Sequence, residues 1–150
     1  MNLIVRVVIF ISLLTSAQLV SAACTLDVVV GDGLVFNAKE LTVEKSCGNI
    51  TVNLKHTGKL AASVMGHNWV LTAGADANDV ASKGLAAGLA NNYVPVGDSR
   101  VIAGTKIIGG GETTSISFST DSLTSGGKYL YVCTFPGHSF VMRGTLIVSA

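Results

Sequence analysis

Residues 131–142 of this chain read YVCTFPGHSFVM, and the fold follows most directly from this stretch. It begins in an apolar, aromatic run typical of a β-strand and then reaches a Pro-Gly turn. Cys133, His138 and Met142 place a thiol, an imidazole and a thioether within ten positions. The turn can direct Cys133 and His138 toward one point, and four residues after His138 the chain can bring Met142 back to the same point. The stretch therefore predicts a metal site in a loop between two strands.

The mixture of donors indicates copper. Sulfur ligands together with imidazole select copper, and two His with one Cys in a plane, plus a distant Met, describe an electron-transfer site. The second histidine must come from elsewhere in the chain. His67 lies directly before the apolar residues 69–71, whereas His56 follows a predicted strand and adjoins a turn at 57–58. On spacing alone, both histidines are candidates.

The composition is that of one apolar domain. The chain has 150 residues, of which 49% are hydrophobic and 13% are charged. The charged share is about half the usual ~25%, and such a chain is too apolar to be disordered. The 10 Lys and Arg residues against 9 Asp and Glu residues give a net charge of +1, and the sequence contains no basic block. We therefore expect no nucleic-acid partner.

The first residues have the pattern of a secretory signal peptide. Arg6 is the only charge before an apolar run at 7–14, and small and polar residues follow as far as Ala22. A positive start, a short hydrophobic stretch and a small-residue exit define such a peptide. We therefore predict a signal peptide at residues 1–22 and a mature domain at residues 23–150. The apolar run is too short to span a membrane, which needs about 20 apolar residues.

Lipoprotein processing at Cys24 is an alternative at this end of the domain. Ser21 disfavours it, because such a signal normally has a branched apolar residue there. Removing Arg6 leaves nine positive groups against nine negative ones, so the low charge belongs to the domain itself. We expect an exported protein without a membrane anchor.

Runs rich in Val, Ile, Thr and aromatic residues recur along the mature chain, separated by Gly-rich turns. They predict strands at 25–30, 41–43, 50–55, 68–71, 101–108, 114–118, 129–133 and 145–148. Several alternate apolar with polar residues, as a half-buried strand does. Eight short strands with turns between them predict an all-β fold, an antiparallel sandwich or barrel.

One segment, residues 76–90, is Ala-rich and lacks this alternation. An Asp at its start can cap a helix. Its larger apolar residues and glycines recur at helical intervals: Val80, Gly84, Leu85, Gly88 and Leu89. We predict a helical insertion between strands.

Two motifs resemble the copper motifs of the azurins, a family of bacterial cupredoxins. They are GHNWVL at 66–71 and CTFPGH at 133–138, the latter followed by Met142. The resemblance extends over residues 23–150. It implies a cupredoxin-like Greek-key β-sandwich of about eight strands and one type 1 (blue) copper ion.

Cys24 and Cys47 flank the first predicted strands. Pairing them would constrain the unfolded chain by about 3 kcal/mol and would leave Cys133 alone. The resemblance implies this disulfide, and it also implies the helical insertion at 76–90.

The resemblance implies five ligands to the copper ion. Three are equatorial: His67, Cys133 and His138. Two are axial and weaker, namely the Met142 thioether and the Gly66 carbonyl. Five ligands leave no open position for a substrate, which implies an electron carrier and not an enzyme.

Other residues have supporting roles in this interpretation. Asn68 is expected to hold the ligand loops and orient the thiolate, and Phe135 to direct a backbone N–H toward the sulfur. Pro136 has no N–H to give. We interpret His56 as a structural histidine outside the copper shell and Trp69 as a core anchor.

The implied function is one-electron transport in the periplasm by Cu(I)/Cu(II) cycling, with electrons passing through His138 in an exposed loop. An apolar docking patch is expected around that ligand, made of Leu34, Leu60, Val64, Met65, Leu85, Phe135, Pro136, Phe140 and Val141. Such a patch suits transient docking. The resemblance suggests redox partners such as c-type cytochromes, nitrite reductase or an amine dehydrogenase, and we expect a monomer.

Simpler interpretations and two other functions remain as alternatives. Cys133 alone could be a buried thiol and Met142 alone a core residue, but their fixed spacing with His138 favours ligands. A hydrolase with Cys133 as nucleophile and His138 or His67 as base lacks an acidic residue nearby in sequence. The same donors also bind zinc, so a copper or zinc store or chaperone is the second alternative function.

Overall fold

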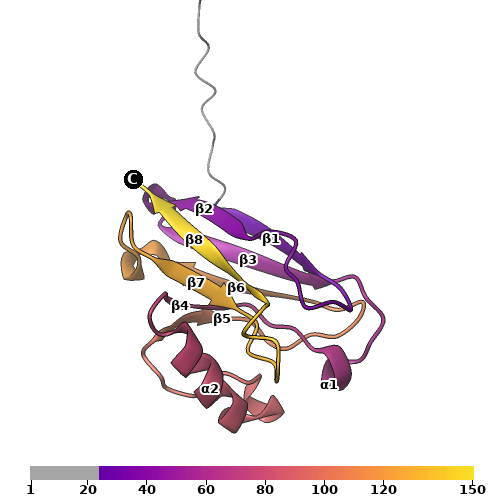
Figure 1. The fold of residues 1–150 in the computed structure, drawn as a ribbon. Coiled ribbons are helices and arrows are strands. Elements are labelled where there is room, and N and C mark those ends of the chain that lie inside the picture. Colours follow the sequence, from indigo (N-terminus) through magenta and orange to yellow (C-terminus); the bar gives the residue numbers. More distant parts are fainter. Residues whose placement is uncertain (1–23) are drawn as a thin grey trace, which may run out of the picture.

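A computed structural model describes residues 24–150, so the predicted signal peptide at 1–22 lies outside the described residues. The described chain forms two β-sheets packed face to face (Figure 1). The smaller sheet has the order β1 (Thr25–Val30), β3 (Asn49–His56), β6 (Thr113–Ser119). The larger has the order β2 (Glu40–Glu44), β8 (Arg143–Ser149), β7 (Tyr129–Val132), β4 (Val70–Ala73), β5 (Val101–Gly104). The predicted β-sandwich of eight strands is confirmed.

The prediction of wholly antiparallel pairing is wrong for two strand pairs. β1 runs parallel to β3, and β2 runs parallel to β8, while the other four pairs are antiparallel. The cause is the segment at residues 31–39, which carries the chain from β1 in one sheet to β2 in the other. β1 and β2 are therefore not neighbours, and each pairs with a strand that is distant in sequence.

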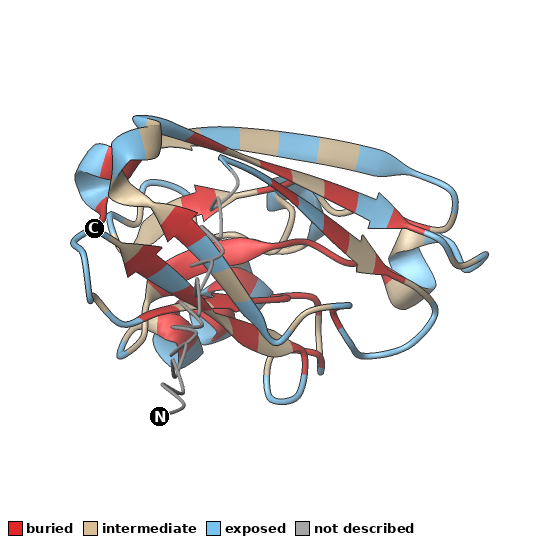
Figure 2. Cartoon of the chain, turned by 90° about the horizontal axis from the view of Figure 1, so that it is seen from above, coloured by how far each residue is buried: buried red, intermediate tan, exposed pale blue. Residues whose placement is uncertain are grey.

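The core lies between the sheets, and along β1, β3 and β8 buried residues alternate with more exposed ones (Figure 2). In β3 the inward residues Ile50, Val52 and Leu54 are fully buried, whereas polar residues between them are partly or fully exposed. Period-two alternation places one set of side chains on each face of a strand. The alternation seen in the sequence thus determines which face of β3 packs into the core.

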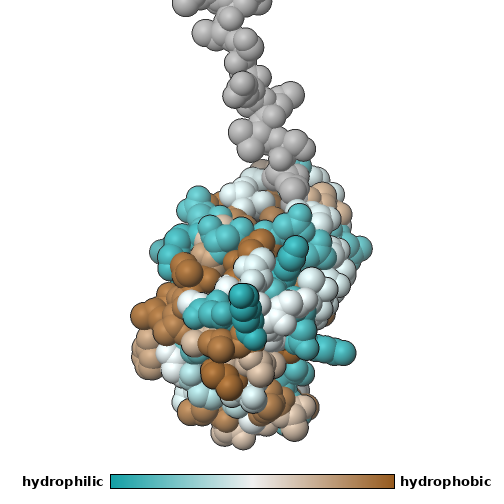
Figure 3. All heavy atoms as spheres, turned by 90° about the vertical axis from the view of Figure 1, so that its right-hand side faces the viewer, coloured by the Kyte–Doolittle hydropathy of each residue, from teal (hydrophilic) through white to brown (hydrophobic). Residues whose placement is uncertain are grey.

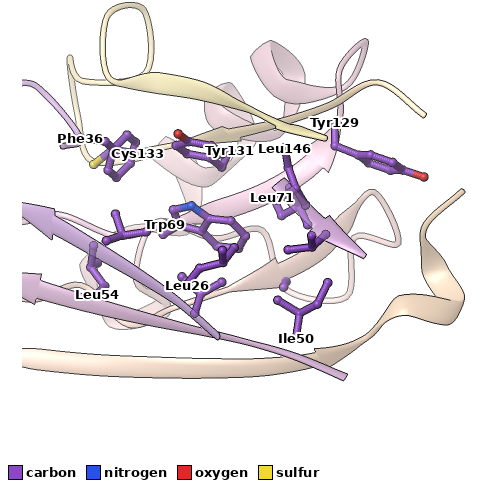
Figure 4. Packing of buried hydrophobic residues seen from close by; sticks show 14 of the residues in the cluster. Leu26, Phe36, Ile50, Leu54, Trp69, Leu71, Tyr129, Tyr131, Cys133 and Leu146 are labelled. Atoms are coloured by element: carbon purple, nitrogen blue, oxygen red, sulfur yellow. The ribbon is translucent and has the colours of Figure 1, made fainter. Parts of the chain in front are cut away.

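Trp69 lies at the centre of this core, as predicted (Figure 4). Its ring centroid is 5.6 Å from that of Tyr131 and 6.2 Å from that of Phe118. Among the described residues, its Nε1 is the one buried side-chain nitrogen or oxygen without a hydrogen-bond partner. Packing alone therefore holds the indole. Cys133 occupies one end of the same core.

The helical insertion is confirmed as α2 (Ala77–Ala87), which covers the outer face of the larger sheet (Figure 1). Its buried residues are Ala77, Val80, Ala81 and Gly84. Leu85 and Leu89, which share the predicted helical pattern, are exposed instead. A side chain at Gly84 would meet the carbonyl oxygen of Tyr93, so this glycine allows the helix to approach the following segment.

Other short elements complete the described chain. A four-residue helix, α1 (Ala62–Met65), was not predicted. The 3-10 turns are Lys45–Cys47, Leu89–Asn91 and Thr120–Ser122. None of the helices within residues 24–150 is both long and apolar enough to cross a membrane.

The disulfide between Cys24 and Cys47 is confirmed. It ties the residue before β1 to the 3-10 turn before β3. Cys133 is the free cysteine of the described chain, and it is buried.

Candidate metal centre

Residues 133–142 form the ligand loop, which joins β7 to β8. The N–H of Cys133 donates to the Met142 carbonyl at 3.0 Å, and the N–H of Met142 donates to the His138 carbonyl at 2.8 Å. Gly137 turns the chain with φ of +81°, a conformation that glycine adopts without strain. These bonds hold the backbones of Cys133, His138 and Met142 side by side.

His67 is distant from the ligand loop in sequence but lies beside it in space. It precedes β4 and forms a two-hydrogen-bond bridge with Ile108, at 3.0 and 2.9 Å. Its Nε2 lies 2.9 Å from the Gly31 carbonyl, which accepts the ring N–H. The opposite ring nitrogen, Nδ1, then has a free lone pair. A histidine fixed in this way by its second nitrogen is the usual arrangement of a metal ligand.

Three donor atoms meet at this point. Cys133 Sγ lies 3.7 Å from His67 Nδ1 and 3.6 Å from His138 Nδ1, and all three residues are buried. Metal bonds of about 2.1 Å to nitrogen and 2.3 Å to sulfur, separated by about 110–120°, place their donor atoms roughly 3.6–3.8 Å apart. The donor set and its spacing thus fit one metal ion.

The two predicted axial groups lie close to these donors. The Gly66 carbonyl oxygen is 4.0 Å from Cys133 Sγ. A side chain at Gly66 would overlap the Ala62 carbonyl and Ile107, so only glycine fits here. Met142 is fully buried, and its backbone bonds to Cys133 and His138 keep it beside the loop ligands.

Asn68 joins the segments that carry the donors. Its fully buried side chain accepts the Thr134 N–H at 2.8 Å and donates to Thr134 Oγ1 at 2.7 Å and to the Asn92 carbonyl at 2.8 Å. The segment after His67 is therefore tied directly to the residue after Cys133. The role predicted for Asn68, holding the ligand loops, would act through these bonds, whereas the contributions of Asn92 and Thr134 were missed.

Burial determines the protonation of the donors. It raises the pKa of Cys133 to about 11, against a smaller lowering by the N–H groups of Asn68 and Phe135, which face the sulfur. It lowers the pKa of His67 to about 4 and lowers that of His138. At neutral pH the histidines are neutral and the thiol keeps its proton. A metal ion binding here therefore displaces the thiol proton, because the thiolate is the ligand.

His56 lies beside the donors but is not one of them. Its ring stacks on that of His67 at a centroid distance of 5.1 Å. Nδ1 accepts the Gly58 N–H at 3.0 Å, and Nε2 lies 3.1 Å from the Met65 carbonyl. With Nε2 protonated, both ring nitrogens are satisfied, and the ring is fully buried. The interpretation of His56 as a structural histidine agrees with this geometry.

The predicted docking residues differ in exposure. Phe140 is 83% exposed, Val64 61% and Leu85 56%, but Phe135 is only 9% exposed and lies beneath the surface. His138, expected in an exposed position, is 5% exposed, because its ring packs against those of Phe135 and His67. Only a small edge of this ligand reaches solvent.

Comparisons with known proteins agree with this site. A family model described as "Copper binding proteins, plastocyanin/azurin family" matches residues 22–149. Azurin-1 of Alcaligenes xylosoxydans xylosoxydans is 56% identical over 125 residues, which cover 83% of this chain and 97% of that protein. The azurin of Pseudomonas aeruginosa is 50% identical over 133 residues, 89% of this chain and 90% of that protein.

A solved structure is similar over the same region. It is that of the azurin Az-iso2 from Methylomonas sp. strain J, which superposes with a TM-score of 0.83 at 46% sequence identity. The match covers 86% of this chain and all of that chain.

Proposed function

The chain belongs to the plastocyanin/azurin family of copper-binding proteins, and we propose that five of its residues hold the copper ion. The equatorial ligands are His67, Cys133 and His138, and the weaker axial ones are Met142 and the Gly66 carbonyl. The protein is a blue-copper electron carrier and not an enzyme. The observation that carries the ligand assignment is the meeting of three buried donor atoms, all within 4.8 Å of one another.

When bound, the copper ion supplies a one-electron Cu(I)/Cu(II) couple. The protein's contribution is to keep the donors in place while the charge at the site changes. Gly31 fixes the His67 ring, and Asn68 ties the two ligand-bearing segments together. The N–H groups of Asn68 and Phe135 face the sulfur and stabilise its negative charge. Burial of the three donor residues, Asn68 and Phe135 excludes water and limits reorganisation during transfer.

The test is the visible spectrum of the Cu(II)-loaded protein together with voltammetry. We expect an intense blue absorption from the copper–thiolate bond and reversible one-electron reduction. A colourless copper-loaded protein would contradict the ligand set and would favour a metal store.

We also propose that residues 1–22 direct export to the periplasm and are removed after Ala22. The disulfide Cys24–Cys47 supports this, because disulfides persist in oxidising compartments. Mass spectrometry of protein from the periplasmic fraction should give a chain that starts at Ala23. Recovery of an unprocessed chain in the cytoplasmic fraction would refute the proposal.

The proposed partners are redox proteins such as c-type cytochromes, nitrite reductase or an amine dehydrogenase, which dock transiently on the apolar patch. Figure 3 looks at the end of the domain that carries the ligand loop and α1, where hydrophobic side chains gather toward the lower left. Phe140 and Val141 of the ligand loop, Val64 of α1 and Leu85 of α2 are the most exposed members of the patch. Leu85 lines a pocket with Pro136 and Phe140 of the loop that carries His138, and α1 ends directly before Gly66, so a partner bound here lies close to the proposed copper ligands.

A charge within the patch tests this proposal. Val64→Glu and Met65→Lys should each slow transfer to a partner by about tenfold or more, because an unpaired charge buried at an apolar interface is costly. The optical spectrum should remain nearly unchanged. Val96→Glu is the matched control, since Val96 is 81% exposed but lines a separate pocket, with Ala90 and Asp98, that contains no residue of the ligand loop. Equal rates for Val64→Glu and Val96→Glu would exclude docking through this patch.

A further inference from the structure

Arg143 lies between the ligand loop and α2. It is the first residue of β8 and follows Met142 directly. In the sheet it pairs with Val132, which belongs to the same buried cluster as Val80 of α2. Paired residues of neighbouring strands share a face of the sheet. The half-buried side chain of Arg143 therefore lies on the face that α2 covers.

The guanidinium of Arg143 joins two separate elements. Its Nε donates to the Ser139 carbonyl at 2.7 Å, and its Nη2 donates to the same oxygen. Nη2 also donates to Asn78 Oδ1 at 3.0 Å. Ser139 is the residue after His138, and Asn78 lies in the first turn of α2. One side chain thus connects the loop to the helix.

We propose that Arg143 is a positioning residue that braces the outer half of the ligand loop against α2. The inference rests on the proposed role of His138 as a copper ligand. The backbone bonds within the loop link Cys133, His138 and Met142 to one another, and in the outer half, residues 139–141, the N–H of Val141 donates to the His138 carbonyl at 3.1 Å. Phe140 and Val141 in this outer half are exposed, so packing does little to hold them. The Arg143 brace fixes the backbone next to His138 and so keeps its imidazole in one direction when the charge of the site changes.

An arginine suits this task better than a lysine. The guanidinium is planar and presents its donors in a fixed fork, so Nε and Nη2 can bind one carbonyl while the same group reaches a second acceptor. Hydrogen bonds from a charged donor are also stronger than neutral ones. The ammonium group of a lysine is a single point charge. It could bind the Ser139 carbonyl or Asn78, but it would not fix the orientation of one relative to the other.

The first readout is hydrogen–deuterium exchange by NMR, in the copper-free protein, at the amides of Val141 and Met142, which both donate to the His138 carbonyl. Arg143→Met should accelerate this exchange by about tenfold or more. The loss of a hydrogen bond to a charged group usually shifts the equilibrium between the closed and the locally opened backbone by at least about tenfold. Asn78→Ala should accelerate it less, since Asn78 is an exposed residue and the bonds to Ser139 remain. Arg143→Lys should exchange more slowly than Arg143→Met but faster than the parent protein.

Arg100→Met is the matched control. Arg100 is another partly buried arginine that contacts α2, through Asp79, but it does not touch the ligand loop. Arg100→Met should leave the exchange of the Val141 and Met142 amides unchanged. Parent-like exchange in Arg143→Met, or equal acceleration in Arg100→Met, would overturn the proposed brace. Because this readout needs no copper, it stays valid if the proposed ligand set fails.

The second readout is the rate at which the copper-loaded protein loses its ion to an excess of chelator. Arg143→Met should release copper about tenfold faster, in the range seen for groups that orient metal ligands. Arg100→Met should release it at the parent rate. Faster amide exchange with an unchanged release rate would overturn the link between the brace and His138.

Discussion

Cys133→Ser should abolish the blue absorption of the copper-loaded protein and slow electron transfer by more than about 100-fold. Removing a group that merely orients a metal ligand already costs about 10- to 100-fold, and Cys133 is itself the sulfur donor. Serine keeps the shape of the side chain, at a slightly smaller volume, but replaces the soft thiolate with a hydroxyl, which is a poor ligand for Cu(I). The spectrum and the rate of reduction by a small-molecule donor measure the two effects.

His56→Gln is the matched control for this prediction. His56 is as buried as the donors and stacks on His67, but both of its nitrogens bind backbone groups. The variant should stay blue. A blue Cys133→Ser protein, or a colourless His56→Gln protein, would show that the donor set is wrongly assigned.

Asn68→Ala should lower the free energy of unfolding of the copper-free protein by roughly 3–5 kcal/mol. Alanine leaves the Thr134 N–H, the Thr134 hydroxyl and the Asn92 carbonyl without the partner that Asn68 supplies. Each unsatisfied buried polar group costs about 1–3 kcal/mol. Because a domain has about 5–15 kcal/mol of stability in total, this loss should be visible as a large shift of the denaturation midpoint.

Asn53→Ala provides the comparison on the outer face of β3. Asn53 makes one side-chain hydrogen bond, to Asp27, at an exposed position. Its replacement should cost no more than about 0.5 kcal/mol, the usual range for surface substitutions. A similar loss of free energy of unfolding for both variants would show that the hydrogen bonds of Asn68 do not hold together the segments that carry His67 and Cys133.

The sequence predicted those features that depend on local pattern. Alternation in β3 and β6 revealed strands, Ala-rich residues 76–90 revealed α2, and the Cys-Pro-Gly-His spacing revealed the ligand loop. Leu85 was expected in the docking patch, and it is 56% exposed. Helical spacing alone does not say which side of α2 meets the sheet, and the small residues Ala77 and Gly84 form that side.

Features that depend on distant contacts could not be predicted in this way. The parallel pairing of β1 with β3 depends on where the chain crosses between sheets, and no local signal marks that crossing. The carbonyls of Gly31 and Asn92 act through backbone atoms, which every residue possesses, so residue type does not reveal them. The burial of His138 likewise results from packing against His67, which is remote in sequence.

The position of β8 within the larger sheet has a consequence for the order of assembly during synthesis. β8 lies between β2 and β7, so this sheet cannot close until the last strand of the domain has left the ribosome. Cys133, His138 and Met142 emerge just before it. A nascent chain therefore has neither the finished sheet nor the donor set, and long-range pairing of this kind forms slowly. The delay suits the proposed export, because a chain that has not yet folded can still be passed across a membrane.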